Sequence, residues 1–164
     1  TAHKRSLADA RDLAGAIESM TRLNRRAAEL AGEFALRSAT DITGYGLLGH
    51  AEELAANSGV GLRIGLGAVP LLPGALEYAR RGVLPGGLGR NRDYLLGAGA
   101  VRLAEGLEDA HAQLLFDPQT SGGLLFALPQ AQAAELRARF AAAGEPIWEI
   151  GEVVVGAGID VGQF

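Results

Sequence analysis

Glycine is the residue that most constrains this chain, because 24 of its 164 residues are glycine. This is about twice the share found in an average globular domain. The glycines follow no collagen-like repeat, so we expect them at tight turns and close backbone approaches. Hydrophobic residues make up 48% of the chain and charged residues 21%, which favours a buried core over disorder. At this length the sequence predicts one soluble globular domain over residues 1–164, or one domain with an extra helical arm.

Composition also excludes several classes of function. The chain has no cysteine, which removes disulfides, thiolate metal sites and cysteine nucleophiles. A formal net charge of −4 disfavours a nucleic-acid partner held through phosphate charge. No apolar run of about 18 residues and no signal-peptide pattern occurs, so we expect no membrane partner. The first residue is Thr1, which indicates a processed chain or a piece of a longer one.

The periodicity of apolar residues predicts interleaved helices and strands. One long helix is expected over residues 6–34, with Ser6 as its cap, Asp9 reaching back, and Gly15 or Asn24 as points where it could divide. Further helices are expected at residues 47–58, 73–79 and 130–143, and strands at 60–66, 114–116, 124–128 and 147–155. Residues 38–41 are interpreted as a short polar segment and residues 84–99 as a glycine-rich loop. The predicted class is α+β, with a mixed or antiparallel sheet covered by helices.

The first polar motif is TDITGYG, residues 40–46, directly before a helix. Its glycines allow a tight turn with exposed N–H groups, and a helix N-terminus adds partial positive charge, so a phosphate could dock at Thr43 and Gly44. Asp41 would then hold Mg²⁺, which takes one or two carboxylates together with phosphate oxygens and water. The alternative is that Asp41 and Thr43 only cap the helix.

The second polar motif is DPQTSGG, residues 117–123, between two apolar runs. It could line a polar site or an interface, or it could simply close a turn through side-chain bonds to its own backbone. His50 and Glu53 are a conceivable metal pair, but no second histidine follows, and a buried or capping histidine is the alternative. Arg90 and Arg92 could contact phosphate or could be solvated loop charges.

Taken together, the two motifs resemble those of the selenophosphate synthetase (selenide, water dikinase) family. The resemblance runs over TDITGYGLLGH, residues 40–50, and DPQTSGGLL, residues 117–125. Tyr45 stands where phenylalanine is common in the family. Supporting matches are residues 1–5 (TAHKR), 23–25 (LNR), 69–70 with 74–75, and 85–87 (PGG) followed by Asn91.

This resemblance implies the carboxy-terminal domain of a longer enzyme, with the fold shared by the aminoimidazole ribonucleotide synthetase superfamily. The family converts ATP, selenide and water into selenophosphate, AMP and phosphate with Mg²⁺, for selenocysteine and selenouridine synthesis. Its amino-terminal domain carries the reactive cysteine or selenocysteine, so no catalytic residue is expected in this chain. The implied partners are ATP, selenide, the chain's own amino-terminal domain and a second copy in a homodimer, and the implied location is the cytoplasm.

Residue by residue, the resemblance implies that Asp41 is a Mg²⁺ ligand and that Thr43 and Gly44 lie on the phosphate side of the turn. It assigns residues 117–123 a structural role only. Two alternatives stay open. The chain could be a non-catalytic scaffold that dimerises or docks the missing domain, or it could belong to a related ATP-dependent synthetase or kinase, such as thiamine-monophosphate kinase.

Overall fold

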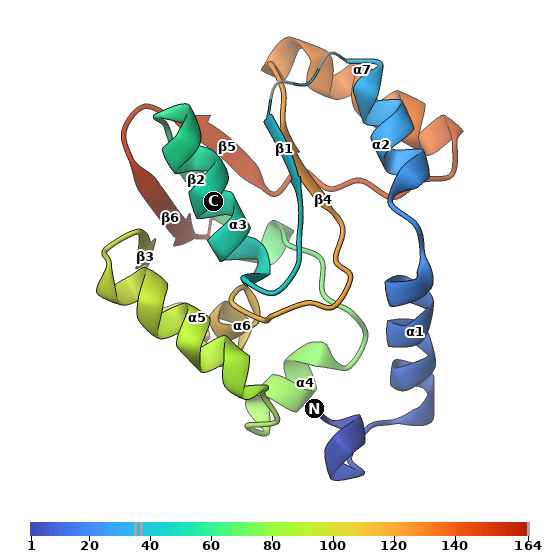
Figure 1. The fold of residues 1–164 in the computed structure, drawn as a ribbon, viewed down its shortest axis with the longest axis vertical. Coiled ribbons are helices and arrows are strands. Elements are labelled where there is room, and N and C mark those ends of the chain that lie inside the picture. The colour runs from blue at the N-terminus through green and yellow to red at the C-terminus, as the bar shows by residue number, and fades with distance from the viewer. Residues whose placement is uncertain (35, 37, 164) are drawn as a thin grey trace.

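The computed structural model describes residues 1–34, 36 and 38–163, and Figure 1 shows their helices arranged around two separate sheets. The helices are η1 (His3–Arg5), α1 (Ala10–Thr21), α2 (Arg25–Gly32), α3 (Gly46–Ser58), η2 (Leu66–Ala68), α4 (Ala75–Arg80), α5 (Gly86–Gly97), α6 (Asp109–Leu114) and α7 (Gln130–Ala142). The strands are β1 (Ser38–Asp41), β2 (Gly61–Gly65), β3 (Val101–Leu103), β4 (Leu124–Ala127), β5 (Gly151–Val154) and β6 (Gly158–Gly162). The predicted α+β class is confirmed.

The larger sheet has four strands in the order β3-β6-β2-β5. Strand β2 runs parallel to β6 and antiparallel to β5, and β3 runs parallel to β6, so this sheet is mixed as expected. The strand predicted at 60–66 is confirmed as β2. The strand predicted at 147–155 is shorter, because only Gly151–Val154 pair as β5. Strands β3 and β6 were not predicted, since segments of three to five residues carry little periodicity of their own.

Strand β5 begins at Gly151. This glycine lies opposite Ile64 in the ladder, and a Cβ added there would fall far inside van der Waals contact with the carbonyl oxygen of Arg63. Any other residue at this position would push β5 away from β2. The glycine therefore permits a close approach of two backbones.

The smaller sheet is an antiparallel ribbon of β1 and β4, with Ser38 opposite Ala127 and Asp41 opposite Leu124. The segment 38–41, interpreted from the sequence only as a short polar segment, is therefore a strand. It is short and polar, and its pairing partner lies far along the chain, so no local pattern marks it. The strand predicted at 124–128 is confirmed as β4.

Two separate hydrophobic cores flank this ribbon. The central core consists of Ile42, Leu47, Leu48, Ala51, Ile64, Leu66, Leu88, Leu95, Val101, Leu115, Phe116, Ile159 and Val161. The second core, between α2 and α7, consists of Leu30, Ala31, Leu136 and Phe140. In β4, Leu125 packs against the central core and Phe126 against the second one. Because successive side chains of a strand point to opposite faces, one strand serves both cores.

The long helix predicted over residues 6–34 is divided into α1 and α2. Its cap is Asp9, whose Oδ1 accepts a hydrogen bond from the N–H of Arg11 at 2.8 Å, whereas Ser6 has a left-handed conformation after η1. The break falls at Asn24, one of the two expected points, and not at Gly15. The Asn24 side chain bonds the carbonyl of Gly122 at 3.1 Å instead of capping α2.

Two further predictions were wrong because burial of apolar side chains, and not the local sequence, decides the structure of these segments. Residues 86–97, expected as part of a loop, form α5, and residues 114–116, expected as a strand, form the end of α6 and the turn after it. Burial of Leu88 and Leu95, two turns apart, stabilises α5 despite its glycines. Leu115 and Phe116 are fully buried, and a short apolar run alone does not distinguish a strand from a buried helix end.

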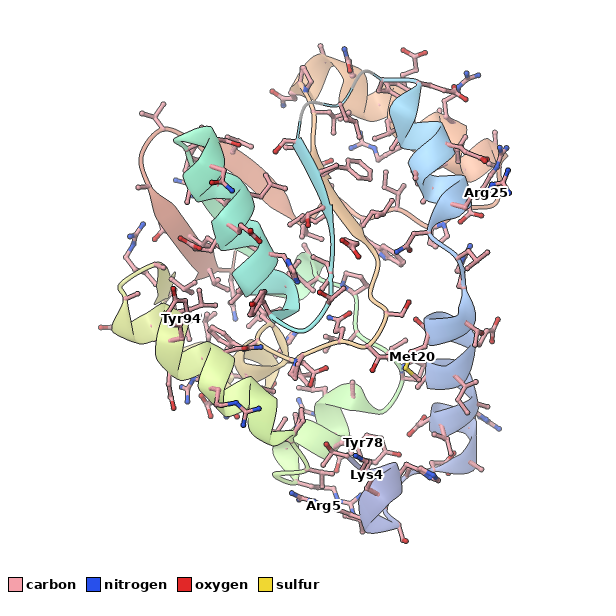
Figure 2. All side chains as sticks on the ribbon, in the orientation of Figure 1. Lys4, Arg5, Met20, Arg25, Tyr78 and Tyr94 are labelled. Atoms are coloured by element: carbon pink, nitrogen blue, oxygen red, sulfur yellow. The ribbon has the colours of Figure 1, made fainter. Side chains whose placement is uncertain are left out.

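Helix α1 has no buried residue, and Tyr78 of α4 bonds its N-terminal end. Figure 2 shows Tyr78 near η1, and its hydroxyl accepts from the N–H of Asp9 at 2.8 Å and donates to Asp12 Oδ2 at 2.7 Å. The Asp9 N–H lowers the pKa of Tyr78, but the bond to Asp12, burial and the two negative charges together raise it above 10.0. Within the described residues, no helix has the length and apolar character that crossing a membrane requires.

We predict that Gly151→Ala disrupts the β2–β5 pairing. The added methyl group meets the Arg63 carbonyl, so the free energy of unfolding should fall by about 1–3 kcal/mol. Gly67→Ala is the matched control, because a Cβ at Gly67 meets nothing within 4 Å, and it should change stability by less than about 0.5 kcal/mol. Urea unfolding measures both, and equal effects would contradict the steric explanation.

Candidate functional site

Asp41 is the last residue of β1, opposite Leu124, and its side chain is exposed. Its carboxylate makes no hydrogen bond or ion pair with any residue that the structure describes. The antiparallel ribbon fixes the backbone on which Asp41 sits, while the carboxylate itself stays free. An exposed acid on a rigid strand end can serve as a ligand without first breaking an internal bond.

The chain turns sharply between Asp41 and α3. The carbonyl of Thr43 accepts hydrogen bonds from the N–H groups of Gly46 and Gln119, both at 3.0 Å. Gly46 has a φ of 71°, and a Cβ there would lie 2.8 Å from the carbonyl carbon of Phe116. Only glycine therefore fits at the start of α3.

The capping alternative is wrong in this structure. The residue before α3 is Tyr45, and no side chain, from Asp41, Thr43 or elsewhere in the described chain, bonds the first N–H groups of this helix. The N–H groups of Gly44 and Tyr45 likewise have no acceptor among the described residues. Free N–H groups beside the positive end of a 13-residue helix make this turn able to accept an anion.

The two sequence motifs lie against each other. The N–H of Ile42 donates to the carbonyl of Gly123, and the N–H of Gly122 donates to the carbonyl of Ile42, both at 2.9 Å. A Cβ at Gly122 would lie 2.6 Å from the Ile42 oxygen, so glycine is required there too. Residues 117–123 thus support the turn that follows Asp41. Sequence reasoning gave this segment a structural role but did not connect it to the first motif.

His50 fixes the side chain of Thr43. Its Nε2 lies 3.0 Å from Thr43 Oγ1, its ring packs against Tyr45 with the centroids 5.6 Å apart, and it is 8% exposed. Its Nδ1 lies 3.9 Å from a carboxylate oxygen of Glu53. The buried-histidine interpretation is supported over the metal pair, because one ring nitrogen already faces a hydroxyl group. Among the described residues, no three histidine or acidic side chains are grouped to hold a metal.

Helix α5 contributes a residue that sequence reasoning named only as a family match. Asn91 Nδ2 donates to the carbonyl of Gly44 at 3.0 Å and to that of Phe116 at 3.1 Å. One side chain therefore joins the two motifs. Its neighbour Arg92 forms an ion pair with Asp109 at 3.1 Å, so this arginine is engaged with α6.

Asp117 lies beside the motif junction, the place where residues 40–46 and 117–123 meet, and its side chain is half-buried. Its backbone carbonyl oxygen would lie 2.9 Å from a Cβ added at Gly46. Burial raises the pKa of Asp117 above 3.8. Its side chain has no hydrogen-bond partner in the described structure. Ionisation of Asp117 therefore lowers the free energy of unfolding of the protein.

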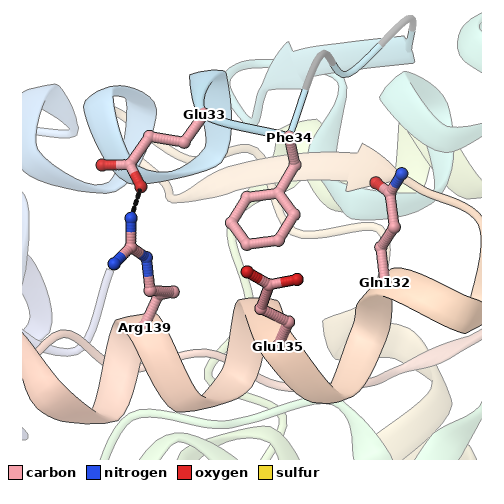
Figure 3. A pocket seen from close by; sticks show the side chains of 5 residues that line it. All are labelled: Glu33, Phe34, Gln132, Glu135 and Arg139. Atoms are coloured by element: carbon pink, nitrogen blue, oxygen red, sulfur yellow. Dashed lines mark hydrogen bonds and ion pairs between the residues drawn. The ribbon is translucent and has the colours of Figure 1, made fainter.

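A separate open hollow of about 340 Å³ lies between α2 and α7. Figure 3 shows the Phe34 ring above Glu135, with Glu33 paired to Arg139 beside it and Gln132 at the far side. This hollow lies near the first residue of β1, whereas Asp41 is at the other end. It is therefore not part of the motif junction.

Residues 2–162 match the family described as AIR synthase related protein, C-terminal domain. The chain belongs to this family. It is 45% identical over 124 residues to a selenide, water dikinase of Caldanaerobacter subterraneus subsp. tengcongensis, and 44% identical over 155 residues to one of Pelobacter propionicus. These matches cover 76% and 94% of this chain but 35% and 44% of the two relatives. The chain thus spans less than half the length of these relatives.

Among solved structures, a thiamine-monophosphate kinase from Stenotrophomonas maltophilia is similar, with a TM-score of 0.50 and 20% sequence identity. The match covers 77% of this chain and 31% of that one. At this identity the likeness supports the fold alone. The expected resemblance to the AIR synthase carboxy-terminal domain is confirmed by the family match.

We predict that Asp117→Asn stabilises the protein at neutral pH. The folded state holds the Asp117 proton to a higher pH than the unfolded state does, so stability is lost as pH rises from the unfolded pKa through the raised folded one. Asparagine carries no charge, so the variant should have a higher melting temperature at about pH 7 and no advantage at about pH 3. Asp93→Asn, at an exposed position of α5, is the control. A pH-independent difference would contradict this account.

Proposed function

We propose that this chain is the carboxy-terminal domain of a selenide, water dikinase and contributes to its Mg·ATP site. Sequence identity of 44% over 155 residues to such a relative supports the reaction class. The observation that carries the site is the free, exposed carboxylate of Asp41 beside the unpaired N–H groups of the Gly44 turn. The complete enzyme would convert ATP, selenide and water into selenophosphate, AMP and phosphate.

The donor set of this chain fits a shared Mg²⁺ site. Asp41 offers one carboxylate, and the described residues hold no larger ligand cluster. Mg²⁺ commonly takes one or two protein carboxylates and fills its remaining positions with phosphate oxygens and water. Asp41 would hold the ion, and the ion would neutralise charge on the polyphosphate.

The turn would bind and orient the phosphates. Gly44 leaves space for close approach, and the first turn of α3 adds partial positive charge next to it. Thr43 keeps a fixed side-chain position because of its bond to His50. These groups stabilise negative charge without supplying a nucleophile, so the chemical step belongs to the amino-terminal domain. We further propose a cytoplasmic homodimer as the working form.

A second candidate function is that the chain is a docking or dimerisation scaffold. Exposed apolar side chains on and around α1 favour it, with Leu23 78% and Ile17 49% exposed. Such an apolar face typically packs against another part of an assembly. The two functions are compatible, because a docked domain can also supply a ligand. A related kinase of the same superfamily is less well supported, since the thiamine-monophosphate kinase shares only the fold.

We predict that Asp41→Asn in the full-length enzyme lowers selenophosphate formation by about 100-fold or more and raises the Mg²⁺ concentration needed for activity. The amide keeps the shape of the side chain but loses the charge that binds the cation. Phosphorus NMR with ATP, Mg²⁺ and selenide measures the product. Asp93→Asn is the matched control and should retain wild-type turnover, because Asp93 is an exposed aspartate on α5. Wild-type turnover of Asp41→Asn at limiting Mg²⁺ would refute the assignment.

The scaffold function predicts a different response. Changing Ile17 and Leu23 together to serine in the full-length enzyme should weaken subunit or domain association, because apolar contact area is lost. The Mg²⁺ dependence of any remaining activity should stay unchanged. Analytical ultracentrifugation and limited proteolysis measure the effect. If association and protease resistance are both unaltered, the exposed face of α1 does not dock.

A further inference from the structure

Helix α5 has no part in the function proposed so far, yet it lies against both motifs. A Cβ at Gly87 would lie 2.9 Å from Pro118, so the first turn of α5 is pressed onto the second motif. Leu88 and Leu95 anchor the same helix in the central core. Asn91 therefore projects from a rigidly held backbone, and it is half-buried.

The carboxamide of Asn91 uses both of its N–H donors. One points to the carbonyl of Gly44 at 3.0 Å and the other to the carbonyl of Phe116 at 3.1 Å. An amide nitrogen has only two hydrogens to donate. Because the two acceptors belong to different segments, the side chain is a clamp between the turn after β1 and the chain leading into residues 117–123.

Holding the Gly44 carbonyl also orients the next N–H group. A peptide unit is planar and trans, so its C=O and N–H point in opposite directions. The carbonyl of Gly44 is drawn toward Asn91, and the N–H of Tyr45, on the same peptide unit, therefore points away from α5. That N–H has no acceptor among the described residues. Glycine at position 44 would otherwise allow this unit to rotate.

We propose that Asn91 is a positioning residue for the ATP polyphosphate, because it clamps the Gly44 carbonyl and thereby directs the Tyr45 N–H toward the bound phosphates. The proposal rests on the proposed Mg·ATP function of this turn. If the unit rotated, a carbonyl oxygen would face the phosphates in place of a donor, and attraction would become repulsion. The clamp thus decides whether a partial positive or a partial negative charge of the backbone faces the phosphates. Asn91 has this effect without contacting the phosphates itself.

Asn24 offers a matched control for this role. Its Nδ2 donates to the carbonyl of Gly122 at 3.1 Å and is also half-buried. It therefore makes the same type of bond to the second motif, but from the segment between α1 and α2 and with no hydrogen bond to Gly44. Loss of Asn24 should loosen residues 117–123 while leaving the Gly44 peptide clamped.

The experiment compares Asn91→Ala, Asn91→Asp and Asn24→Ala in the full-length enzyme by steady-state kinetics with ATP and with selenide. Both Asn91 variants should raise the KM for ATP by about tenfold or more, the factor that one hydrogen bond to a charged group contributes. The KM for selenide should stay unchanged. Asn91→Asp should have the stronger effect, because its carboxylate repels both carbonyls. Asn24→Ala should raise the KM for ATP much less than Asn91→Ala does, because the Gly44 peptide stays clamped.

An ATP KM that rises equally for Asn91→Ala and Asn24→Ala would overturn the positioning role and leave only loop stability. An unchanged ATP KM in Asn91→Asp would also overturn it. These failures are separate from a failure of the proposed function, which Asp41→Asn tests. If Asp41→Asn abolishes activity and the Asn91 variants match Asn24→Ala, the Mg·ATP site stands and the clamp is refuted.

Discussion

The paired hydrogen bonds between Ile42 and the two glycines at 122 and 123 are the interaction on which the structure depends. They extend the β1–β4 ribbon beyond its last ladder pair and bring two segments that are far apart in the chain into one junction. A buried backbone group without a partner is costly, so this pairing leaves little freedom in the register of the two segments. Glycine at 122 is required because no Cβ fits against the Ile42 carbonyl.

The ribbon also holds together two cores that make no single hydrophobic cluster. Leu125 faces the central core and Phe126 faces the core between α2 and α7. Shifting the β1–β4 register by one residue would turn Leu125 and Phe126 to the opposite faces and remove each from the core it packs against. The same constraint places Asp41 at the end of the ribbon with its carboxylate in solvent. Core packing and site geometry therefore depend on one strand pairing.

At the motif junction, the polar groups that support the turn are hydrogen-bonded within the domain, whereas those proposed to bind a ligand have no partner among the described residues. The carbonyls of Thr43 and Gly44 and the hydroxyl of Thr43 all have partners within the domain. The Asp41 carboxylate and the N–H groups of Gly44 and Tyr45 have none among the described residues. Such a division keeps a binding surface rigid and unoccupied by its own side chains, which lowers the reorganisation needed when a charged ligand binds. It is also consistent with a chain that spans less than half of the relatives it matches.

The sequence by itself determined the α+β class, the helix that ends at Ser58, strand β2, helix α7 and the two polar motifs around Asp41 and Asp117. Each of these carries a local signal: an apolar period, a glycine stop or an unusual run of polar residues. The Mg²⁺ role of Asp41 stays a prediction. Only the tertiary structure decided that residues 38–41 form a strand, that residues 86–97 form a helix and that Asn91 joins the two motifs. These depend on partners distant in sequence, and burial and hydrogen bonding to such partners outweigh the weak local preferences of glycine-rich and polar segments.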